Sequence, residues 1–461
     1  MSERHARPYD SVLDLIGWTP MVRLKAVTDG ARTPVYVKCE FMNPGGSVKD
    51  RIGLAMLEAA ERDGSLLPGG TIVEATGGNT GLALAMVASL KGYRCICTMP
   101  DKMSGEKVKL LRAFGAEVII TPTAVPPDHP DHYLQKARSI TADTPGAVMA
   151  DQFYNPANPD AHYETTGREI WEQSEGRVTH LVASAGTGGT ITGTARYLKE
   201  RNPDVRVIGV DPEGSMIAPF YNTGEKVEGH PYKVEGVGND KIPGSLDLDI
   251  VDEYRVLGDG AAFRMARRVS REEGLFGGGS SGLLVQVAVE VAQELDDPDA
   301  FVVTFASDWG ERYLSKVYDD DWMRENGFLE RPRRATAREV VAAKKSGVGP
   351  LITVEPHTPV RMALSTITAH DIGQLPVVLD GECIGSITEG RLMARVIEDP
   401  TLLDKPVDEL MGAPFPVLDG RADSEEIRQL LARDNPACLV RDGGALVGII
   451  TRYDVVRALT A

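Results

Sequence analysis

The chain has 461 residues, of which 42% are hydrophobic and 25% charged, and its formal net charge is −17. This length predicts two or three domains rather than one compact core. Because so acidic a chain repels phosphate backbones and anionic head groups, we expect neither nucleic acid nor a membrane as its partner.

The start of the chain and its cysteines predict a cytoplasmic protein. The opening segment MSERHARPYDSVLDLIG has no apolar run behind basic residues, so we expect no signal peptide. No stretch reaches the roughly 18 uninterrupted apolar residues of a spanning helix. Five scattered cysteines without a CxxC spacing indicate reduced thiols. They are Cys39, Cys95, Cys97, Cys383 and Cys438.

Short β-rich runs alternate with helical patterns from about residue 35 to residue 307. This alternation predicts a mostly parallel sheet with helices on both faces. Ligands bind such sheets at the carboxyl ends of the strands. The predicted strands are Val35–Phe41, Thr71–Ala75, Tyr93–Met99, Glu117–Thr121, His180–Ser184, Val205–Val210 and Phe301–Ala306. Predicted helices include Asp50–Asp63, Gly81–Lys91 and Glu106–Phe114.

The first chemical motif is NPGGSVKDR, residues 43–51, where Lys49 begins a helical pattern after a strand. The positive end of a helix disfavours a cation and lowers the pKa of the amine. Such an amine can attack an aldehyde. The alternative is a solvated surface lysine.

The second motif is EATGGNTG, residues 74–81, a loop between a strand and a helix. Its backbone N–H groups and hydroxyls can bind an anion, and a substrate carboxylate fits this description. Asn79 can donate to a ring oxygen. A simple glycine-rich turn is the alternative reading.

The third motif is GTGGT, residues 186–190, which has the small residues and exposed amides of a phosphate cradle. A dinucleotide site competes with this reading, because Asp211 closes a later strand where a ribose-binding acid would lie. Ile191 replaces the third glycine of the dinucleotide pattern, and no Walker lysine follows. These two departures disfavour a dehydrogenase.

The fourth motif is GGGSSG, residues 277–282, which also opens a helix. It can be a flexible turn, or its serine can hydrogen-bond the nitrogen of a pyridine ring. Four motifs in this order, each at a strand-to-helix junction, are far more specific than any one of them.

The pattern changes near residue 327, where the polar and basic segment GFLERPRRATAR suggests a domain boundary. Beyond it LPVVLDGECIGSITEGRL (375–392) parallels PACLVRDGGALVGIITRYDV (436–455). Each repeat is too short to bury a core alone, so the two should pack as a tandem module. We therefore expect a core at 1–326, a linker at 327–336, and two repeat domains at 337–400 and 401–461.

These motifs resemble those of fold-type II pyridoxal-phosphate enzymes, the family of cysteine synthase and cystathionine β-synthase, over about residues 8–325. The resemblance implies an α/β fold like the tryptophan synthase β-subunit, with two subdomains built on parallel sheets. It implies that pyridoxal 5'-phosphate forms a Schiff base with Lys49, that Asn79 meets its 3-hydroxyl and that Ser280 faces its ring nitrogen. The implied phosphate contacts are Gly186, Thr187, Gly188, Gly189 and Thr190. The implied substrate contacts are Thr76, Gly77, Asn79, Thr80 and Gln152.

Several long segments follow the cystathionine-forming members of this family, among them QFYNPANPDAHYETT (152–166) and VEGVGNDKIP (234–243). The resemblance implies a lyase that replaces the β-hydroxyl of L-serine with the thiolate of L-homocysteine, with Lys49 as general base. The nearest alternative is a cysteine synthase using O-acetylserine or O-phosphoserine and sulfide. Threonine dehydratase and threonine synthase share the fold. An alternative from a different functional class is an adenosyl-nucleotide sensor whose enzyme core is vestigial.

The C-terminal repeat resembles tandem domains of the cystathionine-β-synthase type, which bind adenosyl ligands. Thr451 and Asp454 match the Thr-x-x-Asp pattern that contacts a ribose, whereas Thr388 is followed at that spacing by Arg391. We therefore expect one competent site, for S-adenosylmethionine or an adenine nucleotide. Family habit implies a homodimer or homotetramer.

The chain departs from the family pattern at three places. Gly77 stands where serine is usual, and Asn239 stands where tyrosine is common. Some members carry an N-terminal haem domain held by Cys and His, but only His5 precedes Cys39 here, so we expect no haem. We also expect no metal, because the segment HPDH (129–132) lies in a Pro-rich loop without further ligands nearby.

Overall fold

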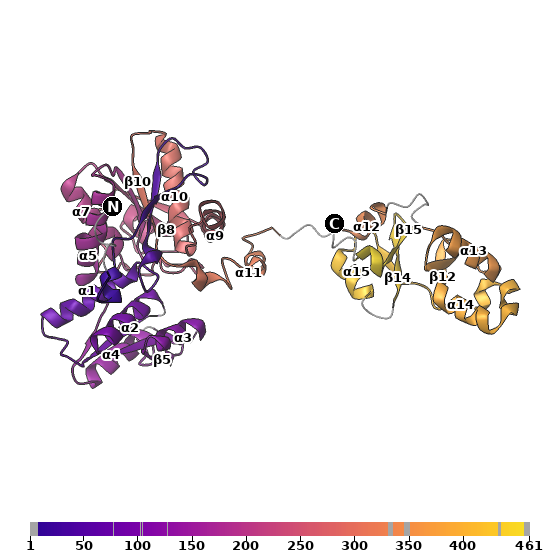
Figure 1. The fold of residues 1–461 in the computed structure, drawn as a ribbon, viewed down its shortest axis with the longest axis horizontal. Helices are drawn as coiled ribbons and strands as arrows, with labels where there is room; N and C mark the ends of the chain where they lie inside the picture. The colour runs from indigo at the N-terminus through magenta and orange to yellow at the C-terminus, as the bar shows by residue number, and fades with distance from the viewer. Residues whose placement is uncertain are drawn as a thin grey trace. The chain divides into compact units, whose positions relative to one another are not determined.

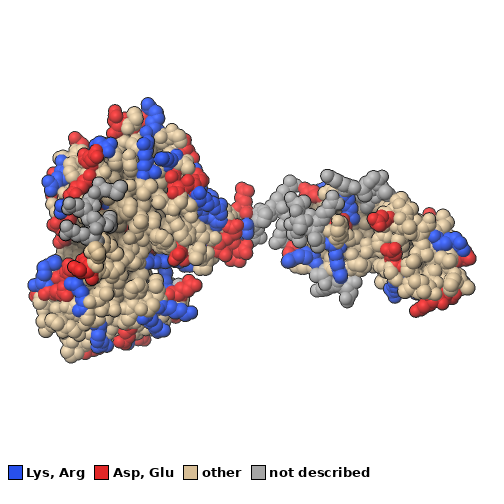
Figure 2. All heavy atoms as spheres, viewed as in Figure 1, with Lys and Arg blue, Asp and Glu red and all other residues tan. Residues whose placement is uncertain are grey.

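The computed structural model describes residues 8–76, 78–101, 103, 105–126, 128–330, 335–344, 351–431 and 435–455. The chain divides into two compact units, Met1–Glu330 and Arg331–Ala461 (Figure 1). The division falls inside the basic segment 327–336. On the face shown in Figure 2, acidic and basic side chains are interspersed over the N-terminal unit.

The N-terminal unit contains two sheets, and each is the centre of a lobe. The large lobe surrounds a six-stranded sheet in the order β1-β2-β10-β7-β8-β9, parallel except for the β1/β2 pair. Its strands are Met21–Arg23 (β1), Val35–Cys39 (β2), His180–Ser184 (β7), Arg206–Pro212 (β8), Glu253–Leu257 (β9) and Val302–Ala306 (β10). The small lobe surrounds a parallel four-stranded sheet in the order β5-β4-β3-β6. Its strands are Thr71–Ala75 (β3), Arg94–Pro100 (β4), Glu117–Thr121 (β5) and Ala147–Met149 (β6).

Helices cover the sheets, as expected for parallel strands that are buried on both faces. The small lobe has Lys49–Arg62 (α1), Asn79–Lys91 (α2), Gly105–Ala113 (α3) and Tyr133–Asp143 (α4), seen in the lower half of the unit in Figure 1. The large lobe has Ala157–Ala161 (α5), Arg168–Gln173 (α6), Gly189–Arg201 (α7), Ile217–Thr223 (α8), Asp259–Arg268 (α9), Gly279–Leu295 (α10) and Asp320–Glu325 (α11). Two π-helices, His162–Gly167 (η4) and Val269–Glu273 (η5), continue α5 and α9. Short 3-10 turns lie at Val12–Leu15 (η2), Glu40–Met42 (η3) and Gly310–Tyr313 (η6).

The α/β class with two mostly parallel sheets agrees with the expectation from the motifs. Three strands were not predicted, namely β1, β6 and β9, because each is short or only partly buried and lacks a long apolar run. The strand predicted to reach Phe41 ends at Cys39, and the chain then turns into η3. This turn brings Glu40 into a buried ion cluster described below.

The C-terminal unit repeats one hairpin and helix. The first repeat has Gln374–Leu379 (β11), Glu382–Thr388 (β12) and Glu389–Glu398 (α14). The second has Ala437–Asp442 (β14) and Ala445–Thr451 (β15), with Val417–Asp419 (β13) pairing β14 in parallel. Ala337–Ala342 (α12), Val360–His370 (α13), Pro400–Asp404 (η7), Val407–Glu409 (η8) and Ser424–Leu431 (α15) complete the unit.

The two hairpins differ in their turns. Asp380 and Gly381 both have positive φ, as a two-residue hairpin of this type requires. In the second hairpin the positive-φ residues are Gly443 and Gly444, one position later than the expected Asp-Gly turn. Arg441 joins the repeats, because its guanidinium donates to both carboxylate oxygens of Glu382 at 2.7 and 2.5 Å.

Among the described helices, none combines the length and the apolar character needed to cross a membrane.

Candidate active site

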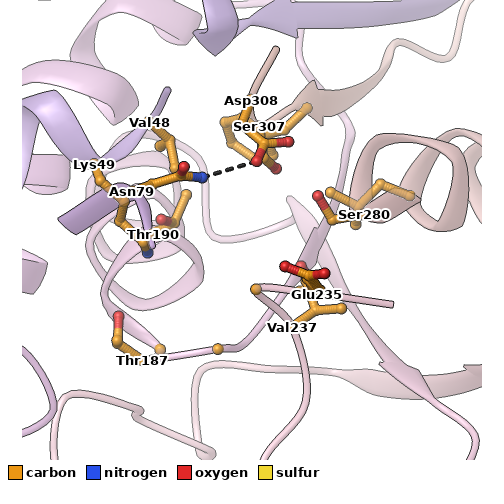
Figure 3. A pocket seen from close by; sticks show the side chains of 16 residues that line it. Val48, Lys49, Asn79, Thr187, Thr190, Glu235, Val237, Ser280, Ser307 and Asp308 are labelled. Atoms are coloured by element: carbon orange, nitrogen blue, oxygen red, sulfur yellow. Dashed lines mark hydrogen bonds between the residues drawn. The ribbon is translucent and has the colours of Figure 1, made fainter. Parts of the chain in front are cut away.

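The four sequence motifs meet at one pocket with about 570 Å³ of empty space. It lies where four helices begin, α1, α2, α7 and α10, so their positive ends converge on it. Figure 3 shows Lys49 and Asn79 on one side and Ser280 on the other. Motif residues in the lining are Lys49, Asn79, Gly186, Thr187, Gly188, Thr190 and Ser280; the other lining residues include Ser184, Glu235, Val237, Ser307 and Asp308.

Lys49 is the first residue of α1, and its amine faces the pocket. Within the described chain its Nζ has no hydrogen-bond or ion-pair partner. Burial lowers the pKa of Lys49 to about 8, while the carboxylate of Asp308 acts in the opposite direction. The direction is the one expected from the helix start, but its cause is burial, which that expectation did not use. An amine of this pKa is partly neutral near neutral pH.

Three positions where the chain passes from β7 into α7 are glycine because no side chain fits there. A Cβ on Gly186 would lie 2.4 Å from the carbonyl oxygen of Gly236, and one on Gly189 would lie 1.9 Å from Asn158 Oδ1. Gly188 has φ +91°, and a Cβ there would lie 2.4 Å from Leu246 Cβ. The loop is therefore a tight backbone turn at a helix start, which is the geometry that binds phosphate.

Two buried polar residues brace this loop from outside the pocket. Asn158 Nδ2 donates to Thr187 Oγ1 at 3.0 Å. His162 is fully buried in η4, with Nε2 3.2 Å from Thr190 Oγ1 and Nδ1 2.9 Å from Thr166 Oγ1. Burial holds the pKa of His162 well below its usual range, so the ring is neutral. His162 thus supports the pocket hydroxyl of Thr190 instead of acting as a base.

Ser280 and Asn79 face the pocket with different surroundings. Ser280 is 4% exposed, and its hydroxyl has no hydrogen-bond partner among the described residues. Asn79 begins α2, and its amide donates from Nδ2 to Asp308 Oδ2 at 2.8 Å. Arg312 donates to Asn79 Oδ1 on the other side. The orientation of the Asn79 amide is therefore fixed by a carboxylate and a guanidinium.

The predicted substrate residues lie next to the pocket but not in its lining. Thr76, Thr80 and Gln152 are each less than 7% exposed. Thr80 Oγ1 donates to Gln152 Oε1 at 2.6 Å, so these two residues are brought together. Gly77 lies outside the described residues. The carboxylate loop stays a prediction.

Sequence reasoning missed two acidic residues of the pocket lining, Asp308 and Glu235. Asp308 follows β10 by two residues, and its position after a buried strand could have identified it. Glu235 lies in a segment noted only for its likeness to relatives, yet it lines the pocket and binds Lys316 at 2.6 Å. Glu235 also pairs with Lys107 from α3.

A buried ion cluster lies where the two lobes meet, two residues along α1 from Lys49. Arg51 donates to Glu40 from Nε at 2.7 Å and to Glu169 from Nη1 at 2.6 Å. Lys38 Nζ donates to Glu169 Oε2 at 2.7 Å, and Thr19 donates to Glu40 Oε1 at 2.6 Å. Burial alone would raise the pKa of Glu40, but Arg51 and Lys38 lower it to about 2. Glu40 therefore stays charged inside the protein, whereas burial lowers the pKa of Lys38 against the opposing effect of Glu169.

In the C-terminal unit, Thr451 and Asp454 form a local pair. Asp454 Oδ2 accepts from the backbone N–H and the hydroxyl of Thr451, both at 2.7 Å. Lys344 lies 2.8 Å from the same oxygen. In the first repeat, Thr388 is the residue before α14, and its side chain makes no capping hydrogen bond. The two repeats therefore differ at this position.

Comparison with known protein families agrees with this arrangement. Residues 12–308 match the model of the pyridoxal-phosphate dependent enzyme family, and residues 345–398 and 407–461 match the CBS domain. Cystathionine β-synthase from Oryctolagus cuniculus is 44% identical over 392 residues, which are 84% of this chain and 71% of that protein. The Dictyostelium discoideum enzyme of the same name is 36% identical over 98% of this chain and 92% of its own length.

A solved structure resembles about two thirds of the chain. It is a hydrogen sulfide-producing enzyme from Fusobacterium nucleatum, 37% identical, with a TM-score of 0.62. The match covers 66% of this chain and 98% of that one.

Proposed function

Since the chain belongs to the family of pyridoxal-phosphate-dependent cystathionine β-synthases, we propose that it condenses L-serine with L-homocysteine to give L-cystathionine and water. The observation that carries this proposal is the pocket that gathers Lys49, Asn79, the glycine loop and Ser280. The proposal is further supported by the cystathionine β-synthases, because their similarity to this chain extends over both units and not over the N-terminal unit alone.

The residues of the pocket fit pyridoxal phosphate. Gly186, Gly188 and Gly189 have no room for a side chain, which leaves backbone N–H groups open for the phosphate. Lys49 offers an amine and Ser280 a hydroxyl, and neither group has a hydrogen-bond partner among the residues that the structure describes. When bound, the cofactor withdraws electrons from the Cα of an amino-acid substrate.

The chain's own groups then move protons and orient the substrate. Lys49 Nζ, with a pKa near 8, takes the Cα proton of serine and returns it at the end of the reaction. Ser280 is neutral, so it does not hold a proton on the ring nitrogen as a carboxylate would. This favours loss of the β-hydroxyl and addition of the homocysteine thiolate over transamination.

For the substrate carboxylate we propose the start of α2, with Thr76, Gly77, Asn79, Thr80 and Gln152. The N–H groups of the first helical turn supply positive charge there. Because Thr80 donates its hydroxyl to Gln152 Oε1, Thr80 would exchange that bond for one to the carboxylate, whereas Gln152 would donate from its amide nitrogen. The backbone next to Gln152 is also held in place, since Glu74 Oε2 accepts a hydrogen bond from the N–H of Asp151 at 2.9 Å.

The test is a comparison of kcat/KM for two substrate pairs on one preparation. We expect serine with homocysteine to exceed O-acetylserine with sulfide. Dominance of the sulfide reaction by tenfold, about 1.4 kcal/mol of transition-state preference, would make the chain a cysteine synthase with a C-terminal module. No visible absorbance from a bound cofactor would instead favour a vestigial core.

We further propose that the C-terminal module binds one adenosyl ligand near Thr451 and Asp454. A ribose hydroxyl would replace the Thr451 hydroxyl as a donor to Asp454, and Lys344 would lie near the ligand's polar end. Titration calorimetry with S-adenosylmethionine and with ATP should show one site, lost in Asp454→Ala and kept in Asp442→Ala on the neighbouring strand. Two sites per chain would contradict the proposal.

We also propose that the protein is cytoplasmic and forms a homodimer or homotetramer. Light scattering measures the mass of the assembly in solution.

A further inference from the structure

Asp308 makes hydrogen bonds with two of the four motifs, and its neighbour Ser307 with a third, although neither residue belongs to a motif. Its Oδ2 accepts from Asn79 of the second motif at 2.8 Å (Figure 3). Its carbonyl oxygen accepts from the N–H of Gly278 in the fourth motif at 3.2 Å. The adjacent residue, Ser307, accepts from the N–H of Val48, next to Lys49, at 2.8 Å. The segment after β10 therefore joins the helix starts that form the pocket.

The carboxylate of Asp308 is buried and incompletely paired. It is 2% exposed, and Tyr313 donates its hydroxyl to Oδ2 at 2.7 Å. Its Oδ1 has no hydrogen-bond partner in the described chain. Gly278 is close to that oxygen, since a Cβ there would lie 2.4 Å from it. Burial raises the pKa of Asp308, and a buried carboxylate with an unpaired oxygen costs free energy, so such a group needs an explanation.

Three cations and one carboxylate lie around Asp308. Lys49 from α1 lines the same pocket as Asp308, and Lys107 from α3 and Arg312 from η6 favour its charged form. The carboxylate is that of Glu235, which also lines the pocket and is paired with Lys107 and Lys316. Arg312 and Asp308 hold opposite ends of the same amide, so Asn79 has only one orientation that satisfies both. In this orientation one hydrogen of Nδ2 binds Asp308 and the second remains for a ligand in the pocket.

We infer that Asp308 is a positioning residue, which orients the Asn79 amide toward the bound cofactor and supplies the negative charge that Lys49 faces. The inference depends on the proposed function in one respect, the identity of the cofactor. It predicts that the charge of Asp308 raises the proton affinity of Lys49, whereas a purely structural Asp308 would leave that affinity unchanged.

The test compares wild type with Asp308→Asn, which keeps the shape of the side chain and removes its charge. In the full-length chain without cofactor, the pH dependence of Lys49 acetylation is followed by peptide mass spectrometry. We expect the labelling midpoint in Asp308→Asn to move to lower pH by roughly one unit. We also expect the dissociation constant of added pyridoxal phosphate to rise about tenfold, because a neutral amide holds Asn79 less firmly than a carboxylate.

Tyr313→Phe is the matched control, because it removes a hydrogen bond to the same carboxylate and keeps the charge. Its labelling midpoint should stay close to that of wild type. If Asp308→Asn does not fold, the smaller Asp308→Ser tests the same charge. A wild-type midpoint in both Asp308 variants would overturn the inference. Since no substrate is present, a different substrate preference would refute the proposed function without affecting this result.

Discussion

Lys49→Ala is expected to abolish turnover and to leave the chain without covalently attached cofactor. Lys49 lines the pocket with its amine unpaired among the described residues, and burial keeps it partly neutral near neutral pH. Loss of a positioned general base alone costs roughly 10²–10⁴-fold in rate, and loss of the attachment adds to it. Steady-state cystathionine formation measures the first effect. Borohydride reduction followed by peptide mapping measures the second.

Lys109→Ala is the matched control, because Lys109 is an exposed lysine on α3 of the same lobe. It should keep both turnover and the modified peptide. Wild-type turnover in Lys49→Ala would remove Lys49 from the mechanism. A modified peptide that contains another lysine would move the attachment point and leave the pocket assignment wrong.

Arg51→Met should destabilise the N-terminal unit by about 3–5 kcal/mol, the range found when one partner of a buried ion pair is removed. Glu40 and Glu169 would remain buried without the guanidinium that pairs with both. Methionine fills much of the volume, so the loss is chiefly electrostatic. All four tryptophans, Trp18, Trp171, Trp309 and Trp322, lie in the N-terminal unit. Urea unfolding followed by tryptophan fluorescence therefore reports this unit without the module.

Arg62→Met on the same helix is the control, since Arg62 is exposed and ends α1. It should change stability by less than about 0.5 kcal/mol. Equal unfolding midpoints for the two variants would show that the cluster contributes no net stability. Arg51→Lys should rescue only part of the loss, because an ammonium cannot bind two carboxylates in the forked geometry of arginine.

The strands and helices that sequence predicted best are those with strong local signals. The segments Thr71–Ala75, Glu117–Thr121 and His180–Ser184 form strands with the predicted ends. Each is a short apolar run between turn residues, so its own composition determines it. The start of α1 at Lys49 was predicted, and α2 begins at Asn79, two residues before the predicted Gly81; glycine loops precede both helices.

Contacts between distant segments could not be predicted in the same way. Asp308 acquires its role from Asn79, which lies far away in the chain, and no local pattern joins them. The cluster of Lys38, Glu40, Arg51 and Glu169 is likewise built from four separate elements. Charged residues at such positions read as solvated in a single sequence, because burial is decided by tertiary packing.

The order of strands in the large sheet has a consequence for how the protein is made. β10 pairs with β2 on one side and β7 on the other, so Val302 contacts both Val35 and His180. During synthesis, β2 and β7 emerge long before the strand that separates them, and their edges stay open until it arrives. The strands of the small lobe, from Thr71 to Met149, are contiguous in the chain and need not wait. On the ribosome, the small lobe can form early, while the pocket is completed only after the segment that carries Asp308 has emerged.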